Sequence, residues 1–216
     1  NIKHFDDHVI FYLPIPLTFD SDGDPAGVPG FDPNFGTVVG PETRRVTVQT
    51  PGGPQIIDVE SGTHVKLTQI TANLELPLPG DWKLENRFRY RTSDTKRENF
   101  FPNTLTPGVD RLDQLRAGAL AAFPTATDVQ FRYATSPDVG FNPTNQNGNG
   151  LVLDGAAIRI GVELDEILND LRVMKKFSFG EQTHDIAIGF YLAALDETFR
   201  DLRATLFTDV RDNARL

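Results

Sequence analysis

The feature that most constrains this sequence is a long, strict alternation of apolar and polar side chains. In residues 82–91 the apolar side chains recur at every second position, with Asn86 the single exception, and the five intervening positions are all charged. A period of two is the geometry of a β-strand, whose successive side chains point to opposite faces of a sheet. The segment predicts a strand with an apolar face (Trp82, Leu84, Phe88, Tyr90) and a charged face (Lys83, Glu85, Arg87, Arg89, Arg91).

The same alternation recurs elsewhere and predicts two long hairpins. Pro79, Gly80 and Asp81 separate two alternating segments, and these residue types favour a tight turn. Gly180 marks a similar turn later in the chain. We expect strands near residues 4–16, 64–78, 82–97, 158–178 and 184–199, with short turns near 79–81 and 179–183. One apolar face is expected to carry Leu74, Leu76, Leu84, Phe88, Ile188 and Phe190.

Long connections alternate with these short turns. Residues near 18–62, 98–157 and 200–216 are expected to be loops, and apolar spacing between Val109 and Phe123 predicts a short helix in the second of them. Compact soluble domains rarely contain structureless connections of such length. An up-and-down sheet places all short turns at one end and all long loops at the other, as in outer-membrane barrels. The expected fold is an all-β, antiparallel up-and-down meander of about five long strands, forming part of a transmembrane β-barrel.

Period-two alternation also occurs in soluble β-sandwiches, so a ligand-binding or protein-binding β-sandwich module is the alternative. Three features favour the barrel: strands of about ten or more residues, a fully charged opposite face, and the spacing of two aromatic side chains. Trp82 and Tyr90 lie eight residues apart, which is about 26 Å along a strand and about 20 Å along the normal after a tilt of ~40°. That distance approaches the ~25 Å apolar band of such barrels.

Composition excludes several other classes. The chain has no cysteine, which excludes disulfides, thiol nucleophiles and cysteine-ligated zinc. Its net charge of -9 and pI near 4.9 argue against a nucleic-acid partner, because phosphate contacts need a basic surface. No run approaches ~18 apolar residues, so any membrane crossing has to use strands. Catalytic motifs such as GxSxG and HExxH are absent, so we expect neither an enzyme nor a bound cofactor.

Two sets of potential metal ligands are incomplete, and no metal site is expected. Asp20, Asp22 and Asp24 have the spacing of a calcium loop, but Phe31 stands where the loop needs a bidentate Glu. His4 and His8 share one strand face, yet the sequence places no third ligand beside them.

Several local sequences resemble those of TonB-dependent receptors, the plugged outer-membrane barrels that import scarce nutrients. They are FYLPIPL at 11–17, PGFDPNFGT at 29–37, LPLPGDWKLENRFRYR at 76–91, NGNGLV at 147–152, NDLRVMKKF at 169–177, HDIAIGFYLAALD at 184–196 and DVRDNARL at 209–216. The family's TonB box, plug domain and aromatic-terminated last strand are not found in these 216 residues. The resemblance therefore implies an internal segment of a barrel in the outer membrane of a Gram-negative cell.

The resemblance also implies the partners. They are outer-membrane lipid, a plug domain and further barrel strands, the TonB complex as energy source, and a solute such as a metal–siderophore, a cobalamin-like cofactor or an oligosaccharide. The lumen-facing charged side chains are expected to pair with acidic groups of neighbouring strands and of the plug. Solute contacts are expected in the long loops, with Phe31, Phe35, Phe131, Tyr133 and Asn145 as candidates.

Overall fold

The computed structural model describes residues 1–10 and 15–216, and most of them form β-strands. The chain forms two compact units. Unit 1 comprises Asn1–Val9, His64–Lys96 and Ile160–Arg200. Unit 2 comprises Ile10–Thr63, Arg97–Arg159 and Asp201–Leu216. Strands β7, β10 and β11 are divided between the two units, and β6 contributes its first residue, Thr63, to unit 2.

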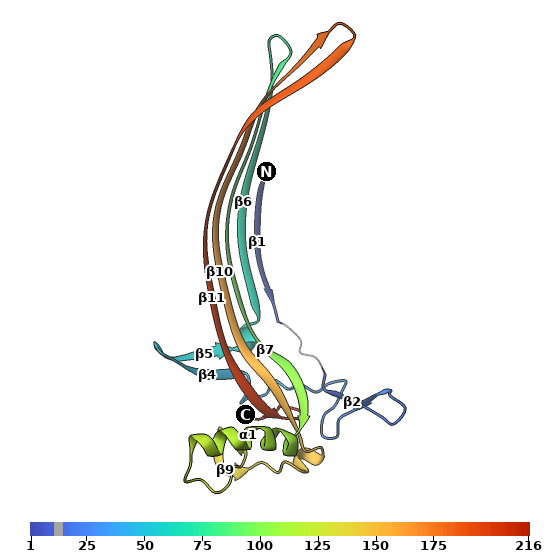
Figure 1. Cartoon of the computed structure of the whole chain (residues 1–216), viewed down its shortest axis with the longest axis vertical. Helices are drawn as coiled ribbons and strands as arrows, with labels where there is room; N and C mark the ends of the chain where they lie inside the picture. Colours follow the sequence, from blue (N-terminus) through green and yellow to red (C-terminus); the bar gives the residue numbers. More distant parts are fainter. Residues whose placement is uncertain (11–14) are drawn as a thin grey trace. The chain divides into compact units, whose positions relative to one another are not determined.

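Five strands form one large sheet in sequential order, β1-β6-β7-β10-β11, which confirms the predicted meander. Figure 1 shows these strands running side by side as a single layer. The sheet does not close on itself among the described residues, because β1 and β11 are its edges. Their bounds are Ile2–Val9 (β1), Thr63–Leu78 (β6), Trp82–Pro107 (β7), Leu151–Phe179 (β10) and Gln182–Asp209 (β11).

The two predicted short turns are confirmed. Gly80 and Asp81 connect β6 to β7 with φ angles of 74° and 62°, and Gly180 connects β10 to β11 with φ of 61°. Positive φ is easy for glycine and tolerated by aspartate, which explains these residue types. The Lys176 backbone N–H donates to the Asp81 carbonyl at 3.3 Å, so both turns lie at the same end of the strands (Figure 1).

Several strand boundaries differ from the expectation. The first strand was expected at 4–16, but it ends at Val9, and part of the expected strand, residues 11–14, lies outside the described residues. The three later strands run well into the expected loops. β7 reaches Pro107 and β10 starts at Leu151, both within the expected loop 98–157. β11 ends at Asp209, within the expected loop 200–216.

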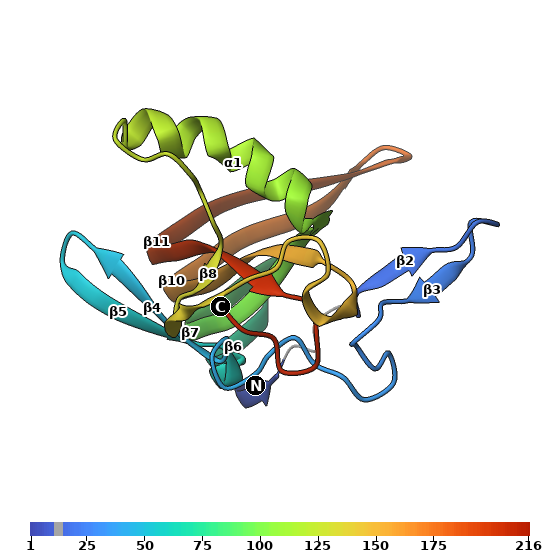
Figure 2. The same ribbon diagram turned by 90° about the horizontal axis from the view of Figure 1, so that it is seen from below.

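The long connections also contain short elements of their own, all in unit 2. The predicted helix is present as α1 (Gly108–Ala122). Figure 2 shows α1, the β2–β3 hairpin and the β4–β5 hairpin as separate projections. The hairpins are β2–β3 (Leu17–Phe19, Pro25–Gly27), β4–β5 (Arg45–Thr50, Gly53–Asp58) and β8–β9 (Arg132–Tyr133, Ser136–Gly140), with single 3-10 turns at Val59–Ser61 and Gln146–Gly148.

Unit 2 contains the hydrophobic core of the chain. One cluster packs residues of the first long loop against β7, β10 and the C-terminal segment, and a second packs β4–β5 against β10. Phe100 is fully buried at the centre of the first cluster. Gly155 lies directly against its ring, because a Cβ at that position would overlap the Phe100 ring and lie 3.1 Å from the Phe101 carbonyl oxygen. The buried apolar members are Val28, Phe31, Val38, Val59, Phe100, Leu153, Val210 and Ala214, and Val46, Ile57 and Ala157.

This packing gives a testable prediction. Gly155→Ala should lower the free energy of unfolding by about 1–3 kcal/mol, because the added methyl group overpacks a buried ring. Gly118→Ala in α1 is the matched control, since a Cβ there meets nothing within 4 Å. It should be neutral or stabilise by roughly 0.5–1 kcal/mol, as expected for glycine replaced inside a helix. Urea unfolding of both variants measures the difference, and equal effects would contradict the packing described.

Candidate functional site: an uncovered apolar face and an aromatic pocket

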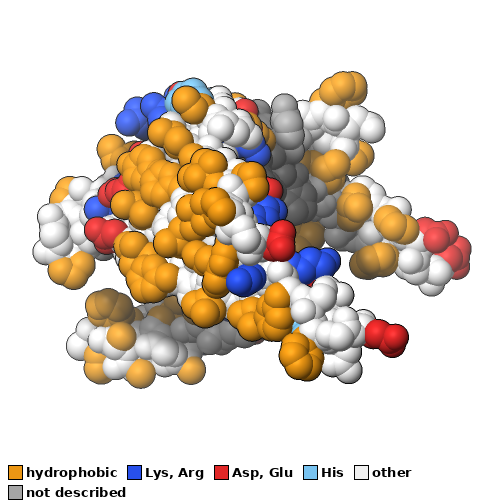
Figure 3. Space-filling view, turned by 90° about the horizontal axis from the view of Figure 1, so that it is seen from above, with side chains coloured by type: hydrophobic (Ala, Val, Ile, Leu, Met, Phe, Trp, Pro, Cys, Tyr) orange, Lys and Arg blue, Asp and Glu red, His pale blue; other side chains and the backbone are white. Residues whose placement is uncertain are grey.

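The apolar face of the sheet in unit 1 has no covering layer. Ile188 and Phe190 are 71% and 63% exposed, and Leu74 and Leu76 are 47% and 41% exposed. Leu84 and Phe88, on a strand flanked by neighbours, are half-buried. Among the described residues of unit 1 only the carboxylate side chain of Glu166 is buried. Viewed from the end with the short turns, hydrophobic side chains form a broad surface area (Figure 3).

Side-chain contacts connect this face from strand to strand. Asn86 of β7 donates to Asn169 of β10 at 3.0 Å, so the alternate residues of β10 that include Leu171 share the face. Phe177 of β10 stacks on His184 of β11 with ring centroids 5.3 Å apart, which brings the even-numbered residues of β11 onto it. The apolar side chains of neighbouring strands are therefore continuous across the sheet.

Polar groups inside the apolar face have partners. The Asn86–Asn169 bond joins two amides that would otherwise lie among apolar side chains. The Lys175 ammonium lies 4.9 Å from the centroid of the Trp82 ring, next to the turn, as a cation–π contact. The long Lys175 side chain thus carries its ammonium to the edge of the apolar face beside the turn.

The apolar face ends at a common level on β1 and β6. Ile2 and Ile70 are its last apolar residues, and the Asn1 carbonyl accepts from the Thr71 N–H at 2.8 Å. The next positions on the same face are polar, where His4 Nδ1 lies 3.1 Å from Thr68 Oγ1.

The face ends in the same way on β7, β10 and β11. One groove is lined by Tyr90 of β7, Ile167 of β10 and Ala194 of β11. The same groove contains Asp165 and Asp196, which are the next residues on this face of β10 and β11. Both carboxylates are exposed. The apolar side chains thus give way to acidic ones at neighbouring positions on adjacent strands.

These two stretches of border lie at the same level. Leu78 and Trp82 flank the first short turn. Ile70 lies eight residues before Leu78, and Tyr90 lies eight residues after Trp82. Eight residues correspond to about 26 Å of strand. On β6 and β7 the apolar face therefore has nearly the same height.

The opposite face carries paired charges, as expected from the sequence. Lys83 Nζ lies 2.9 Å from Glu75 and 2.6 Å from Glu85, and Arg87 is 3.6 Å from Glu85. Exposed pairs of this kind contribute only about 0–1 kcal/mol each. They neutralise the face more than they stabilise the sheet.

Glu166 is the acceptor for two arginines of this polar face. Arg89 Nη2 lies 2.9 Å from one carboxylate oxygen, without hydrogen-bond geometry, and Arg91 Nη2 donates to the other at 3.4 Å. Because Glu166 is 7% exposed, two cations offset the cost of burying its charge.

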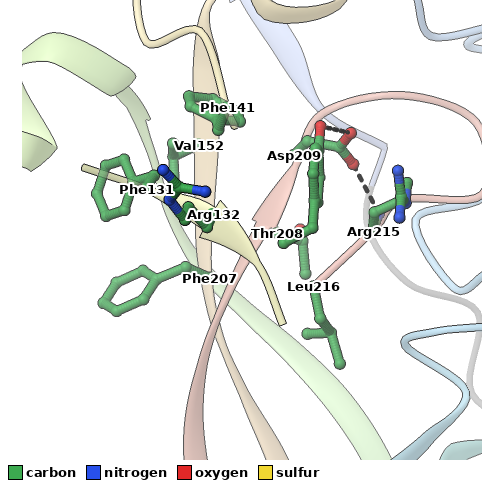
Figure 4. Close-up of a pocket in the computed structure, with 10 residues that line it drawn as sticks. Phe131, Arg132, Phe141, Val152, Phe207, Thr208, Asp209, Arg215 and Leu216 are labelled. Atoms are coloured by element: carbon green, nitrogen blue, oxygen red, sulfur yellow. Dashed lines mark hydrogen bonds between the residues drawn. The ribbon is translucent and has the colours of Figure 1, made fainter. Parts of the chain in front are cut away.

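Unit 2 contains an aromatic pocket, formed by segments that lie far apart in the sequence (Figure 4). The rings of Phe131 and Phe141 meet edge-to-face with centroids 5.9 Å apart, and Phe131 and Phe207 are 6.4 Å apart. Arg215 lies 4.2 Å above the Tyr133 ring, and Arg111 lies 4.8 Å above the Phe207 ring. The wall also contains Arg132, Val152, Thr208, Asp209 and Leu216.

A polar network holds one side of this pocket. The Tyr133 hydroxyl donates to Asp209 at 2.9 Å, and Asp209 also accepts from the Asn147 amide at 3.0 Å and from the Arg215 N–H at 2.6 Å. Burial, reinforced by the hydrogen bond to the Asp209 carboxylate, raises the pKa of the Tyr133 phenol. Tyr133 therefore stays protonated and remains a donor at physiological pH.

Glu42 completes this network behind Arg215. Burial alone would raise the pKa of Glu42, but hydrogen bonds from Thr135 and Arg215 outweigh it and lower the pKa from its ordinary value. The Arg215 Nε donates to Glu42 at 2.8 Å, so the guanidinium is held between the carboxylate and the Tyr133 ring.

The five loop residues predicted to contact a solute lie in different environments. Phe131 and Tyr133 both line the aromatic pocket. Phe31 is 7% exposed in the core, and Phe35 is 91% exposed at the surface. Asn145 is exposed and precedes the second 3-10 turn.

Sequence reasoning missed Phe141, Phe207 and Arg215 as companions of Phe131 and Tyr133. They come from three segments that only the tertiary structure brings together. One available signal was the alternation of Leu202, Ala204 and Leu206, which would have extended the last strand to Phe207.

The potential metal ligands form no metal site among the described residues. Asp20 instead accepts the backbone N–H groups of Asp22 and Asp24, each at 2.9 Å, and so closes the β2–β3 turn. His8 contacts the His64 ring across β1 and β6, with centroids 4.2 Å apart. No helix in the part of the chain that the structure describes is long and apolar enough to cross a membrane.

Comparisons with protein-family models, with curated proteins and with solved structures find no match to this chain. The geometry above is thus the basis for any functional conclusion.

The lowered pKa of Glu42 predicts a pH dependence. A carboxylate whose pKa is depressed by folding stabilises the protein above its ordinary value of 4.5, and this contribution disappears as the pH falls through the lower folded value. Glu42→Gln should therefore reduce the fall in unfolding free energy between about pH 5 and pH 3. Glu60→Gln, which removes an exposed ion pair with Arg44 outside this network, is the control for the loss of one carboxylate. A Glu42→Gln slope equal to that of the wild type would contradict the prediction.

Proposed function

We propose that this chain is a segment of an outer-membrane β-barrel transporter that binds a scarce solute and imports it with energy from the TonB complex. The observation that carries the proposal is the uncovered apolar face of the large sheet, which covers β6, β7, β10 and β11 and ends at Ile2 on β1. A soluble sheet buries its apolar face against another layer. No second sheet covers this face among the described residues, so the β-sandwich alternative lacks its second layer.

The chemistry of the band supports a lipid partner. Its height of about 20 Å along the normal is close to the ~25 Å apolar belt of outer-membrane barrels. Trp82 and Tyr90 lie near its two ends, where amphipathic rings favour membrane interfaces. Beyond Tyr90 the same face carries histidine and carboxylate side chains, which suit water or lipid headgroups.

The topology supports a barrel. All neighbours in the large sheet are consecutive among its five strands, and both short turns lie at one end. The edge strands β1 and β11 leave backbone groups that need partners in a membrane, because hydrocarbon offers none. Further strands of the parent barrel would supply them. The charged opposite face would then line the lumen, where a plug domain provides further partners.

The transport part of the proposal is supported by the resemblance to TonB-dependent receptors in the strand and loop sequences. In such a molecule unit 2 would carry the long extracellular loops, and the aromatic pocket would be one place for solute contact. Further strands, the plug and the TonB complex would belong to the rest of such an assembly.

Arginine substitutions test the assignment of the two faces. An Arg at Leu74, Leu76 or Ile188 should cost about 2–4 kcal/mol in a folding titration of the complete barrel in lipid, because the cation would lie in hydrocarbon. Thr71→Arg and Ala187→Arg on the opposite face are the matched controls and should have mild effects. Equal costs on both faces would overturn the proposal.

A further inference from the structure

The strands β10 and β11 keep one register through the whole of unit 1. Near the short turn Phe177 stacks on His184. At the far end of the unit a Cβ on Gly161 would lie 3.9 Å from the Arg200 Cβ. The same number of residues separates these two contacts on β10 and on β11, so every position between them has a defined partner across the antiparallel pair.

This register places Asp165 of β10 directly opposite Asp196 of β11, at the border of the apolar face. Both side chains are exposed, and in the described part of the chain neither forms an ion pair or a hydrogen bond. Like charges directly opposite each other on neighbouring strands are destabilising. Further along this face Arg200 donates to Glu163, so that guanidinium already has an acidic partner. The two opposed carboxylates therefore favour a cation from outside the chain.

The carboxylates stand at one end of a groove whose walls are otherwise apolar. Tyr90, Ile167 and Ala194 line it, and Glu166 and Leu195 complete the lining from the intervening positions of the strands. The groove offers about 340 Å³ and is open to the surroundings. This volume lies within the range of roughly 300–1,000 Å³ that is usual for ligand sites. The groove continues the apolar face, so an occupant contacts apolar side chains at one end and carboxylates at the other.

We propose that this groove binds a membrane lipid whose headgroup carries a primary ammonium, with the ammonium between Asp165 and Asp196 and the start of the acyl chain against Ile167 and Ala194. The inference rests on the proposed function, because it names one kind of lipid at a face assigned to the bilayer. Ammonium N–H groups donate charge-assisted hydrogen bonds to carboxylates and offset their repulsion. A soluble cation would also pair with the carboxylates, but it would leave the apolar walls in water.

Three probes separate the headgroup charge from the lipid tail. Phosphatidylethanolamine has both, N-acetylated phosphatidylethanolamine lacks the ammonium, and free ethanolamine lacks the tail. Native mass spectrometry of the full chain released from detergent micelles should show phosphatidylethanolamine retained at least several-fold more than its N-acetylated form. Equal retention of the two lipids would overturn the proposal. Free ethanolamine at the same concentration should not displace the lipid, and displacement would overturn the role of the apolar walls.

Variants assign the contacts. Asp165→Asn and Asp196→Asn should each reduce the preference for phosphatidylethanolamine over its N-acetylated form by about three- to tenfold. Asp185→Asn is the matched control, because this exposed carboxylate of β11 lies beside Lys83 and Glu85 of the charged face. It should keep the wild-type preference. An unchanged preference in the double variant of Asp165 and Asp196 would refute the proposal.

Thermal unfolding in micelles gives a second readout that does not depend on lipid retention in the gas phase. Without an ammonium lipid, Asp165→Asn should raise the Tm, because it removes the repulsion between opposed carboxylates. Phosphatidylethanolamine should raise the Tm of the wild type by more than that of Asp165→Asn, since a ligand stabilises the state that binds it. An equal rise in both proteins would contradict the assignment.

Failure of this inference is distinguishable from failure of the proposed function. If the arginine substitutions divide the two faces as expected but the two lipids are retained equally, the transporter proposal stands and the groove assignment is wrong. If phosphatidylethanolamine is preferred as predicted while both faces tolerate arginine equally, the groove assignment stands and the membrane assignment is wrong.

Discussion

The structure depends on an apolar sheet face that has no partner within the described chain. Backbone hydrogen bonds hold the five strands together, but a sheet in water also needs apolar burial, and unit 1 provides almost none. Side chains such as Ile188 and Phe190 contribute favourable free energy only when an apolar medium replaces the water around them. In the proposed barrel, a lipid bilayer would supply that medium along the band.

Several other features follow from this constraint. The Asn86–Asn169 bond keeps two amides satisfied inside the band, and the Lys175 ammonium reaches its end beside Trp82. Charges on the opposite face pair with one another, as in a wet interior. Unit 2 differs because it buries its own core around Phe100, so its loops keep a defined shape that can present a pocket.

Much of the large sheet could be predicted from the sequence, because one face is uniformly apolar within the band and the alternation is therefore visible. Outside the band the apolar and polar side chains no longer alternate regularly, so the sequence did not predict that β7 extends to Pro107. The first strand begins two residues before its expected start and ends at Val9, and residues 11–14 of the expected strand lie outside the described residues. In the pocket, Phe131 and Tyr133 were predicted, whereas Phe207 was not, because its place depends on contacts between distant segments.

The central claim is that lipid covers the face bearing Leu74, and the absence of cysteine in the chain allows a direct measurement. Single cysteines at positions 70–78 can each be spin-labelled in the complete protein, reconstituted in lipid bilayers. The account predicts that oxygen accessibility alternates with a period of two and peaks at positions 70, 72, 74, 76 and 78, while a water-soluble nickel reagent is excluded there. High accessibility to the nickel reagent at those positions, or maxima at the odd positions, would contradict it.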